Sequence, residues 1–320
     1  MGIKFSSAIG LFGCVVALFC SLQPVMAAEN ARGVYLLGFR GPVTGILAPP
    51  GTYLQNNTYF YGGEAKANVD IPDAGRLLVS PKASAVLEVP IGIWVSDRTI
   101  AGGNFAILAG LPFGYFRVSA SAELDLAPLP IRLSGRVEDD AFLMGDPILV
   151  PTIGWHAGNF HWTLSGLVNV PVGDYSTSRL ANVAFNRWAF DVTGAATWLD
   201  PLRGWEVSAA AGFTFNGENP DTDYTTGTEF HFEGAIMRYS PGGFSIGVAG
   251  FHYEQVTGDS GAGARLGEFK GRVSGIGPVF GFAFNVRQTP ITGNIRWYHE
   301  FNVENRLEGD AGYLTINVPL

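Results

Sequence analysis

Three ionisable side chains alternate with phenylalanine rings in the stretch "TEFHFEGA", residues 228–235. Glu229, His231 and Glu233 occupy every second position, and Phe230 and Phe232 fill the gaps between them. In an extended strand, successive side chains point to opposite faces, and residues two apart lie about 7 Å from each other. The three groups would therefore share one face, where they could bind a cation, exchange protons or line a wet passage.

One strand by itself offers a limited chemistry. A closed metal site needs several ligands that converge on one point, whereas a single strand spaces its ligands along a line. We therefore expect these residues to be ordinary polar side chains of a water-filled interior. A role in a permeation pathway or constriction is the functional alternative, a metal site is a third, and the sequence predicts no cofactor.

The same two-residue period recurs in "FHWTLSGLVNV", "RWAFDVTGAATWL" and "WEVSAAAGFTFN", where apolar and small polar residues alternate. This period places the two sets on opposite faces of a sheet. The polar faces of the predicted strands add five candidates for an interior, namely Arg187, Asp191, Glu206, Arg296 and Glu300. Five tryptophans on the apolar faces, Trp162, Trp188, Trp198, Trp205 and Trp297, are candidates for a membrane interface, which favours such rings.

The composition is unusual for a soluble domain. Hydrophobic residues make up 47% of the 320 residues and charged residues only 15%, with 43 glycines and 23 phenylalanines. After residue 27 there is no apolar run long enough for a spanning helix. If the chain enters a membrane, we expect a closed β-barrel, because lipid requires every backbone polar group to be paired within the protein.

The first 27 residues are typical of a secretory signal peptide. Lys4 precedes an apolar run, and small residues follow in "VMAAEN", which predicts cleavage beside Ala27 or Ala28. Both cysteines, Cys14 and Cys20, lie inside this segment, so the mature chain has none. Its loss removes one basic residue and no acidic one, which leaves 19 basic and 28 acidic side chains, a net charge of −9. That charge argues against nucleic acid as a partner.

The joins between the predicted strands indicate a barrel of the outer-membrane type. We expect strands at about 52–65, 82–95, 103–125, 145–157, 160–171, 187–199, 205–216, 228–239, 244–257, 268–285, 291–302 and 311–320. Short turns such as "GN" and "DPLR" alternate with long joins such as "NGENPDTDYTTG". Short turns at one end and long loops at the other are the pattern of these barrels. The prediction is an all-β transmembrane antiparallel barrel of about 12 strands (range 12–14), with both termini at the periplasmic, short-turn end.

Three details of this prediction were left open. The strand at 103–125 contains Pro112 and could be two pieces, and "GIGPVF" suggests a β-bulge. Residues 28–51 precede the barrel at 52–320 and are too apolar for a flexible linker. This N-terminal segment is expected to be either a periplasmic stub or a plug in the lumen. Charged residues of both signs in the lumen are expected to form salt bridges that brace the wall.

Five stretches of the chain are similar to one known family: "NGENPDTDYTTGTEFHFEGA", "GGFSIGVAGFHYEQVTGDSGAGARLGEFKGRVSGIGP", "NVPVGDY", "ANVAFNRW" and "LAPPGTYLQNNTYFYGG". In these stretches the chain resembles the "MetA-pathway of phenol degradation" family of bacterial outer-membrane proteins. It implies a barrel linked to aromatic catabolism that helps hydrophobic compounds cross the outer membrane, distantly like the fatty-acid channel group. It implies no catalytic residue.

The expected function is passive uptake of small hydrophobic or aromatic compounds through the outer membrane of a Gram-negative bacterium. The expected partners are outer-membrane lipid, the barrel-assembly machinery during insertion, and the solute. One alternative is a structural or surface-interaction barrel that transports nothing. Another is a barrel enzyme such as an outer-membrane phospholipase, for which His252 and His299 are the candidate bases, although no motif supports them and the expectation is that the protein is not an enzyme.

Two acidic loop motifs have simpler explanations than the sites they resemble. "GDSG", residues 258–261, matches the surroundings of a serine-protease nucleophile but lacks the partner motifs of such an enzyme. Asp221, Asp223 and Asp259 could bind calcium, yet their spacing is not that of an EF-hand loop. We expect all three to be solvated loop acids.

Overall fold

The computed structural model describes residues 28–29, 32–65, 67–71, 75–126, 131–264 and 267–320. The predicted signal peptide at 1–27 lies outside these residues. Every described regular element is a β-strand. Within these ranges, no helix has the length and apolar character that crossing a membrane requires.

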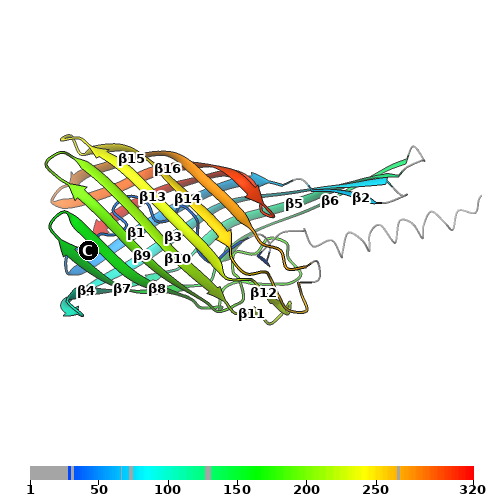
Figure 1. Ribbon diagram of the computed structural model, residues 1–320, viewed down its shortest axis with the longest axis horizontal. Helices are drawn as coiled ribbons and strands as arrows, with labels where there is room; N and C mark the ends of the chain where they lie inside the picture. Colours follow the sequence, from blue (N-terminus) through cyan, green and yellow to red (C-terminus); the bar gives the residue numbers. More distant parts are fainter. Residues whose placement is uncertain (1–27, 30–31, 66, 72–74, 127–130, 265–266) are drawn as a thin grey trace, which may run out of the picture.

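Twelve strands form a closed antiparallel barrel (Figure 1). They are β1 (Gly51–Glu64), β3 (Gly75–Ile100), β4 (Gly103–Gly110), β7 (Ile148–Ala157), β8 (Phe160–Asn169), β9 (Ala189–Asp200), β10 (Trp205–Asn216), β13 (Glu229–Tyr239), β14 (Phe244–Gln255), β15 (Arg272–Val286), β16 (Thr289–Glu304) and β17 (Glu308–Pro319). β1 pairs with β17 on one side and with β3 on the other, which closes the sheet on itself. The predicted fold class is therefore confirmed.

A narrow sheet projects from the long-loop end of the barrel (Figure 1). It consists of the first half of β3 with β2 (Ala67–Ile71), β5 (Phe113–Leu126) and β6 (Ile131–Met144). β5 pairs with β3 from Gly75 to Glu88, and β6 pairs with β5. Two short strands, β11 (Glu218–Asn219) and β12 (Tyr224–Thr225), lie in the loop between β10 and β13.

One open alternative is confirmed and two local predictions are wrong. The strand expected over 103–125 forms two pieces, β4 and β5, separated by Leu111 and Pro112, because proline cannot donate to the ladder. The sequence reading placed no strand over 131–144, which forms β6. The bulge expected at "GIGPVF" is elsewhere: the β15–β16 register is the same on both sides of Gly277 and Pro278, and shifts between Arg272 and Ser274.

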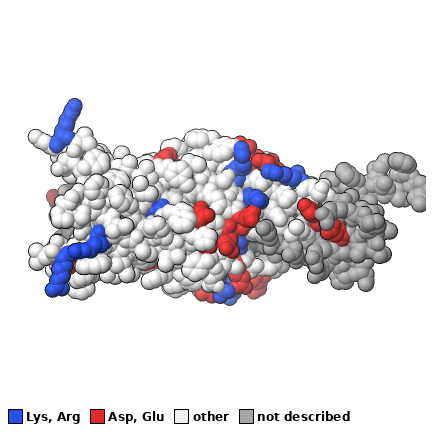
Figure 2. Space-filling model, turned by 90° about the horizontal axis from the view of Figure 1, so that it is seen from above, with Lys and Arg blue, Asp and Glu red and all other residues white. Residues whose placement is uncertain are grey.

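The two faces of the wall follow the predicted alternation. Along β9 the side chains alternate without a break from buried Ala189 to exposed Ala196, and along β10 from exposed Trp205 to exposed Phe215. Large apolar residues such as Phe190, Phe213 and Phe232 are about half exposed on the outer face. Figure 2 shows a broad, mostly uncharged zone over the wall, with basic residues at one end and a mixed band of charges toward the other. The outside of the barrel is therefore apolar around its middle.

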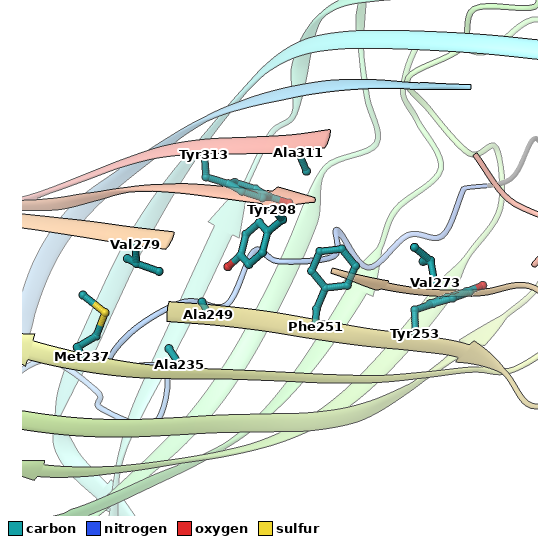
Figure 3. Packing of buried hydrophobic residues seen from close by; sticks show 10 residues of the cluster. All are labelled: Ala235, Met237, Ala249, Phe251, Tyr253, Val273, Val279, Tyr298, Ala311 and Tyr313. Carbon is teal, nitrogen blue, oxygen red and sulfur yellow. The ribbon is translucent and has the colours of Figure 1, made fainter. Parts of the chain in front are cut away.

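The inside is packed on the side formed by β13 to β17. Ten buried residues from these five strands form one cluster (Figure 3), in which Phe251, Tyr298 and Tyr313 are the rings nearest its centre. The rings of Phe251 and Tyr298 meet edge to face with centroids 5.3 Å apart. Leu36, Leu37 and Phe39, which precede β1, pack against this cluster. The lumen on this side is thus filled by side chains and by the N-terminal segment.

We call residues 28–50 the lumen segment. It starts at the long-loop end, where the Ala28 backbone nitrogen lies 3.0 Å from Asp259 Oδ2, and it ends at β1. The start of β1 and the C-terminus lie together at the short-turn end, because the Leu320 nitrogen donates to the Thr52 carbonyl. The expectation that both ends of the chain lie at the short-turn end thus holds for the start of β1 and for the C-terminus. It does not hold for Ala28, which lies at the long-loop end.

Candidate functional site in the barrel lumen

All eight residues predicted to face the interior are buried. Glu229, His231, Glu233, Arg187, Asp191, Glu206, Arg296 and Glu300 are each at most 6% exposed. They come from β9, β10, β13 and β16 and from the loop that precedes β9. Of the five predicted interface tryptophans, Trp162, Trp188, Trp205 and Trp297 are exposed on the outer face and Trp198 is half-buried.

His231 lies at the centre of a closed polar network. Its Nε2 atom is 2.8 Å from Asp191 Oδ2, and that carboxylate also accepts hydrogen bonds from Thr193 at 2.5 Å and Thr214 at 2.7 Å. The ring of Tyr35, from the lumen segment, stacks on the His231 ring with centroids 3.5 Å apart and an angle of 13° between planes. The histidine is therefore covered by the lumen segment and is not exposed to a wet channel.

The backbone of the lumen segment is held by acids and a hydroxyl of the wall. Gly38 N donates to Glu233 Oε1 at 2.9 Å, and Val43 N donates to Glu206 Oε1 at 2.6 Å. Gly45 N donates to Thr197 Oγ1 at 2.9 Å. The donors are main-chain groups, so these contacts use no side-chain polar atom of the segment.

The opposite side of the segment is held through its carbonyl groups. Arg296 Nη1 donates to the Phe39 carbonyl at 2.8 Å, Tyr313 donates to the Leu37 carbonyl at 2.5 Å, and Tyr298 donates to the Gly38 carbonyl at 3.3 Å. Sequence reasoning missed Tyr298 and Tyr313 as binding residues. Both tyrosines occupy inward-facing positions of β16 and β17, which the two-residue period indicates, and their hydroxyls can donate hydrogen bonds.

Two glycines allow the segment to approach the wall closely. Gly38 has φ +76°, and a Cβ there would lie 2.7 Å from the Tyr298 ring. A Cβ on Gly45 would lie 2.5 Å from the backbone nitrogen of Thr197, which is part of the β9 ladder and has no freedom to move. Residues with a side chain at these two positions would separate the segment from the wall.

Two arginines anchor the segment at the long-loop end. Arg187 Nη1 lies 3.2 Å from Glu29 Oε2, with both side chains buried. The guanidinium of Arg32 lies 4.8 Å from the centroid of the Phe116 ring and 5.3 Å from that of Phe185. Burial, and next the positive charge of Arg187, lower the pKa of Arg32 to about 10. Arg32 nevertheless stays charged at neutral pH, where aromatic faces stabilise the cation.

Burial also affects Tyr35, which lies in the middle of the segment. Burial, followed by the charge of Glu233, raises the pKa of the Tyr35 hydroxyl well above its ordinary value. The ring is therefore neutral at any physiological pH. It contributes its apolar face to His231 and carries no charge into the lumen.

The salt bridges expected across the lumen are mostly replaced by hydrogen bonds to uncharged groups. Among the described residues, Asp191 and His231 are the one pair of the eight candidates that forms a salt bridge with each other. Glu229 accepts from Tyr253 at 2.6 Å and Asn216 at 3.0 Å, and Glu300 accepts from Tyr61 at 3.0 Å. The charged groups thus bind hydroxyls, amides and the lumen segment instead of one another.

The wall opposite this polar side is apolar. The inward residues of β3 from Ala85 to Val95 are alanine, leucine, valine and isoleucine, and Leu108 of β4 and Val150 of β7 continue the same surface. A cavity of about 980 Å³ lies between this wall and the lumen segment, whose Leu37 and Ile46 line its other side. Its size is in the range of small-molecule sites, which are mostly apolar with a few polar groups.

Metal binding has no support in the described residues. No three histidine, cysteine or carboxylate side chains among them converge on one point. Asp221 and Asp223 are exposed, as expected, whereas the expectation of a solvated Asp259 is wrong because it is only 1% exposed. Glu229 accepts from Tyr253, His231 contacts Asp191, and Glu233 accepts from the Gly38 nitrogen, so these three side chains do not converge on one point.

These features define a class: a twelve-stranded barrel of the outer-membrane type with a segment of its own chain inside the lumen. The chain belongs to the family described as "Putative MetA-pathway of phenol degradation", whose model matches residues 67–316. No curated protein sequence matches the chain.

One solved structure shares the fold of this chain, and a second is more distantly similar. An outer-membrane channel from Pseudomonas putida F1 is 14% identical, with a TM-score of 0.65 over 87% of this chain and 99% of that chain. A Pseudomonas aeruginosa FadL homologue is 9% identical, with a TM-score of 0.43 over 88% of this chain and 93% of that chain. At these identities the likeness is one of fold.

Proposed function

We propose that the protein is an integral outer-membrane channel through which small hydrophobic or aromatic compounds enter by passive diffusion. The observation that carries this proposal is the apolar cavity of about 980 Å³ between the lumen segment and the inner face of β3, β4 and β7. Water has little to bind on that face, whereas an apolar solute would bury its surface there at about 25 cal/mol per Å². Membership in a family linked to phenol degradation supports the same class of solute.

The outer face supports the membrane location. Exposed Phe, Ile, Val and Leu side chains cover the wall, and a soluble protein rarely exposes so large an apolar surface. Trp162, Trp188, Trp198, Trp205 and Trp297 would lie at the lipid–water boundaries, which favour indole rings. The chain would reach this membrane through cleavage of a signal peptide and insertion by the barrel-assembly machinery.

The lumen segment would act as a plug that narrows the lumen and restricts the passage of water and ions. It is bonded to β9, β10 and β13 on one side and to β16 and β17 on the other, so it divides the interior. In this function Glu206, Glu233 and Arg296 hold the plug in place, and Asp191 and His231 form the surface on which Tyr35 stacks. Selectivity for apolar solutes then follows, because the part of the lumen left open has an apolar wall along β3, β4 and β7.

Ligand binding and conductance test this proposal together. Purified protein in detergent should bind an apolar fluorescent aromatic such as N-phenyl-1-naphthylamine in the cavity, and Leu108→Asp should weaken that binding at least tenfold. The matched control is Ile107→Asp, one residue away on the outer face. Equal binding by both variants would contradict a lumen site. A structural barrel that transports nothing would bind no aromatic in the lumen and give no solute flux.

The lipid-hydrolase alternative has one observation in its favour. His252 Nδ1 lies 2.9 Å from Ser274 Oγ, and His252 Nε2 lies 3.7 Å from Glu254 Oε2. Ser274 is 9% exposed, and a hydroxyl, an imidazole and a carboxylate in series are the groups of a serine hydrolase. The other candidate, His299, binds Asp310 instead.

Hydrolysis of phospholipid in mixed micelles, compared between the parent and Ser274→Ala, tests this alternative. Activity that disappears with the hydroxyl would establish a hydrolase. No activity in either protein is the outcome expected of a channel.

A further inference from the structure

Asp259, in the "GDSG" loop, accepts four hydrogen bonds at the long-loop end of the barrel. Its Oδ2 atom accepts from the Tyr224 hydroxyl at 2.5 Å and from the Ala28 backbone nitrogen at 3.0 Å. Its Oδ1 atom accepts from Gly227 N at 3.0 Å and Gln255 Nε2 at 2.5 Å. The carboxylate thus joins two long loops to the start of the lumen segment.

This carboxylate is buried among neutral donors. Asp259 is 1% exposed, and the Tyr224 hydroxyl, the Gly227 amide and the Gln255 side chain that donate to it are all neutral. Hydrogen bonds offset part of the cost of burying a carboxylate, and a cation in contact with it offsets more of that cost. Among the described side chains, none of the ion pairs includes Asp259. The one remaining contact is the backbone nitrogen of Ala28.

Ala28 has two properties that fit the first residue of a mature chain. It is completely buried, with 0% exposure, and its φ is +56°, a left-handed value that is unfavourable for an internal residue with a Cβ. The torsion φ is defined by the carbonyl carbon of the preceding residue, and the steric conflict involves that residue's carbonyl oxygen. A first residue has neither, so the same position is unstrained at an N-terminus.

We propose that cleavage between Ala27 and Ala28 creates an α-ammonium group that forms a buried ion pair with Asp259 and fastens the lumen segment to the loops. This rests on the proposed export through a signal peptide. In the cleavage, water hydrolyses the amide bond: the water oxygen becomes part of the Ala27 carboxylate of the released peptide, and both water protons go to the Ala28 nitrogen, which becomes an ammonium group. The reaction precedes folding, because the chain is exported before the barrel closes over Ala28.

Because of this ion pair, the attachment of the lumen segment to the loops would depend on cleavage of residues 1–27. A chain that still carries residues 1–27 offers Asp259 a single neutral N–H from Ala28. A cleaved chain offers three N–H donors and a full positive charge. The segment is then fixed at both ends, by Asp259 at the long-loop end and by β1 at the short-turn end.

The N-terminus itself is the first thing to measure. The intact mass of the protein purified from the outer membrane should correspond to a chain that begins at Ala28. A chain that begins at any other residue would overturn the proposal. It would leave the proposed channel function intact, because solute binding is measured separately.

The ion pair is tested with the full mature chain, refolded with either a free or an acetylated α-amino group. We expect acetylation to speed hydrogen exchange at the Gly227 amide at least tenfold, since that amide donates to Asp259. With Asp259→Asn the effect of acetylation should fall below twofold. Asp221→Asn, which removes an exposed acid of the loop that contains Gly227, should leave the effect of acetylation unchanged.

Two results would overturn the ion pair. One is no change in exchange on acetylation of the parent chain, a measurement that does not depend on whether Asp259→Asn folds. The other is an equal acetylation effect in the parent and in Asp259→Asn, which would assign Asp259 a purely structural role.

Discussion

The seating of the lumen segment depends on the absence of a side chain at Gly45. A Cβ there would lie 2.5 Å from Thr197 N and 2.6 Å from the Ala196 carbonyl carbon, both backbone atoms of β9. We therefore predict that Gly45→Ala separates the segment from the wall at this point. It should also break the 2.9 Å hydrogen bond from the residue 45 nitrogen to Thr197 Oγ1.

The magnitude follows from the two contributions. Overpacking against a rigid neighbour costs about 1–3 kcal/mol, and loss of one hydrogen bond costs about 0.5–1.5 kcal/mol. A total of about 1.5–4.5 kcal/mol corresponds to a rise of about 12- to 1,600-fold in the population of the displaced segment, at about 1.4 kcal/mol per tenfold change.

Hydrogen exchange measures this population directly. The reporters are the Gly38 and Val43 amides, which donate to Glu233 and Glu206 and exchange only when the segment leaves the wall. The control is Gly92→Ala on β3, where a Cβ would meet nothing within 4 Å. Unchanged exchange in Gly45→Ala, or equal acceleration in Gly92→Ala, would refute the reasoning.

Three further predictions concern the lumen. Deletion of residues 28–45 should raise single-channel conductance in planar bilayers, because it removes the segment that divides the interior; unchanged conductance would end the plug proposal. Asp191→Asn should destabilise the barrel by about 3–5 kcal/mol, since it leaves buried His231 without its carboxylate, and a heat-shift gel would show this as a lower unfolding temperature. Leu108→Asp should slow uptake of aromatic solutes while leaving conductance to small ions within a factor of about two. An apolar solute in the cavity would remove water from the carboxylate, which is unfavourable, whereas hydrated ions leave the carboxylate in water. Uptake equal to that of the parent would contradict the route through the cavity.

The orientation of the wall residues could be predicted because a strand has a fixed two-residue period. That period alone placed Glu229, His231 and Glu233 inside and Phe232 outside. It also placed most strand ends within three residues of their observed positions, because glycine, proline and asparagine mark the turns. The projecting sheet is only partly predictable: the sequence analysis indicates no strand over β6, whose stretch "IRLSGRVEDDAFLM" carries charges on both faces, as is compatible with a strand that projects from the barrel.

The partners of the interior residues could not be predicted in the same way. Glu233 binds the nitrogen of a residue 195 positions away, and Arg187 binds a residue 158 positions away. Periodicity is a local property and contains no information on such contacts. The sequence does show that the lumen segment is apolar, but its path depends on the shape of a lumen formed by twelve other segments.

The central claim is that small apolar molecules cross the outer membrane through the partly open lumen of this barrel. The most direct test is the initial rate of uptake of an apolar aromatic fluorophore by cells with an intact outer membrane, with and without the protein. We predict a faster rate with the protein than without it, and a rate near that of cells lacking it when Leu108→Asp is produced at the same level. Equal rates in all three strains would contradict the claim.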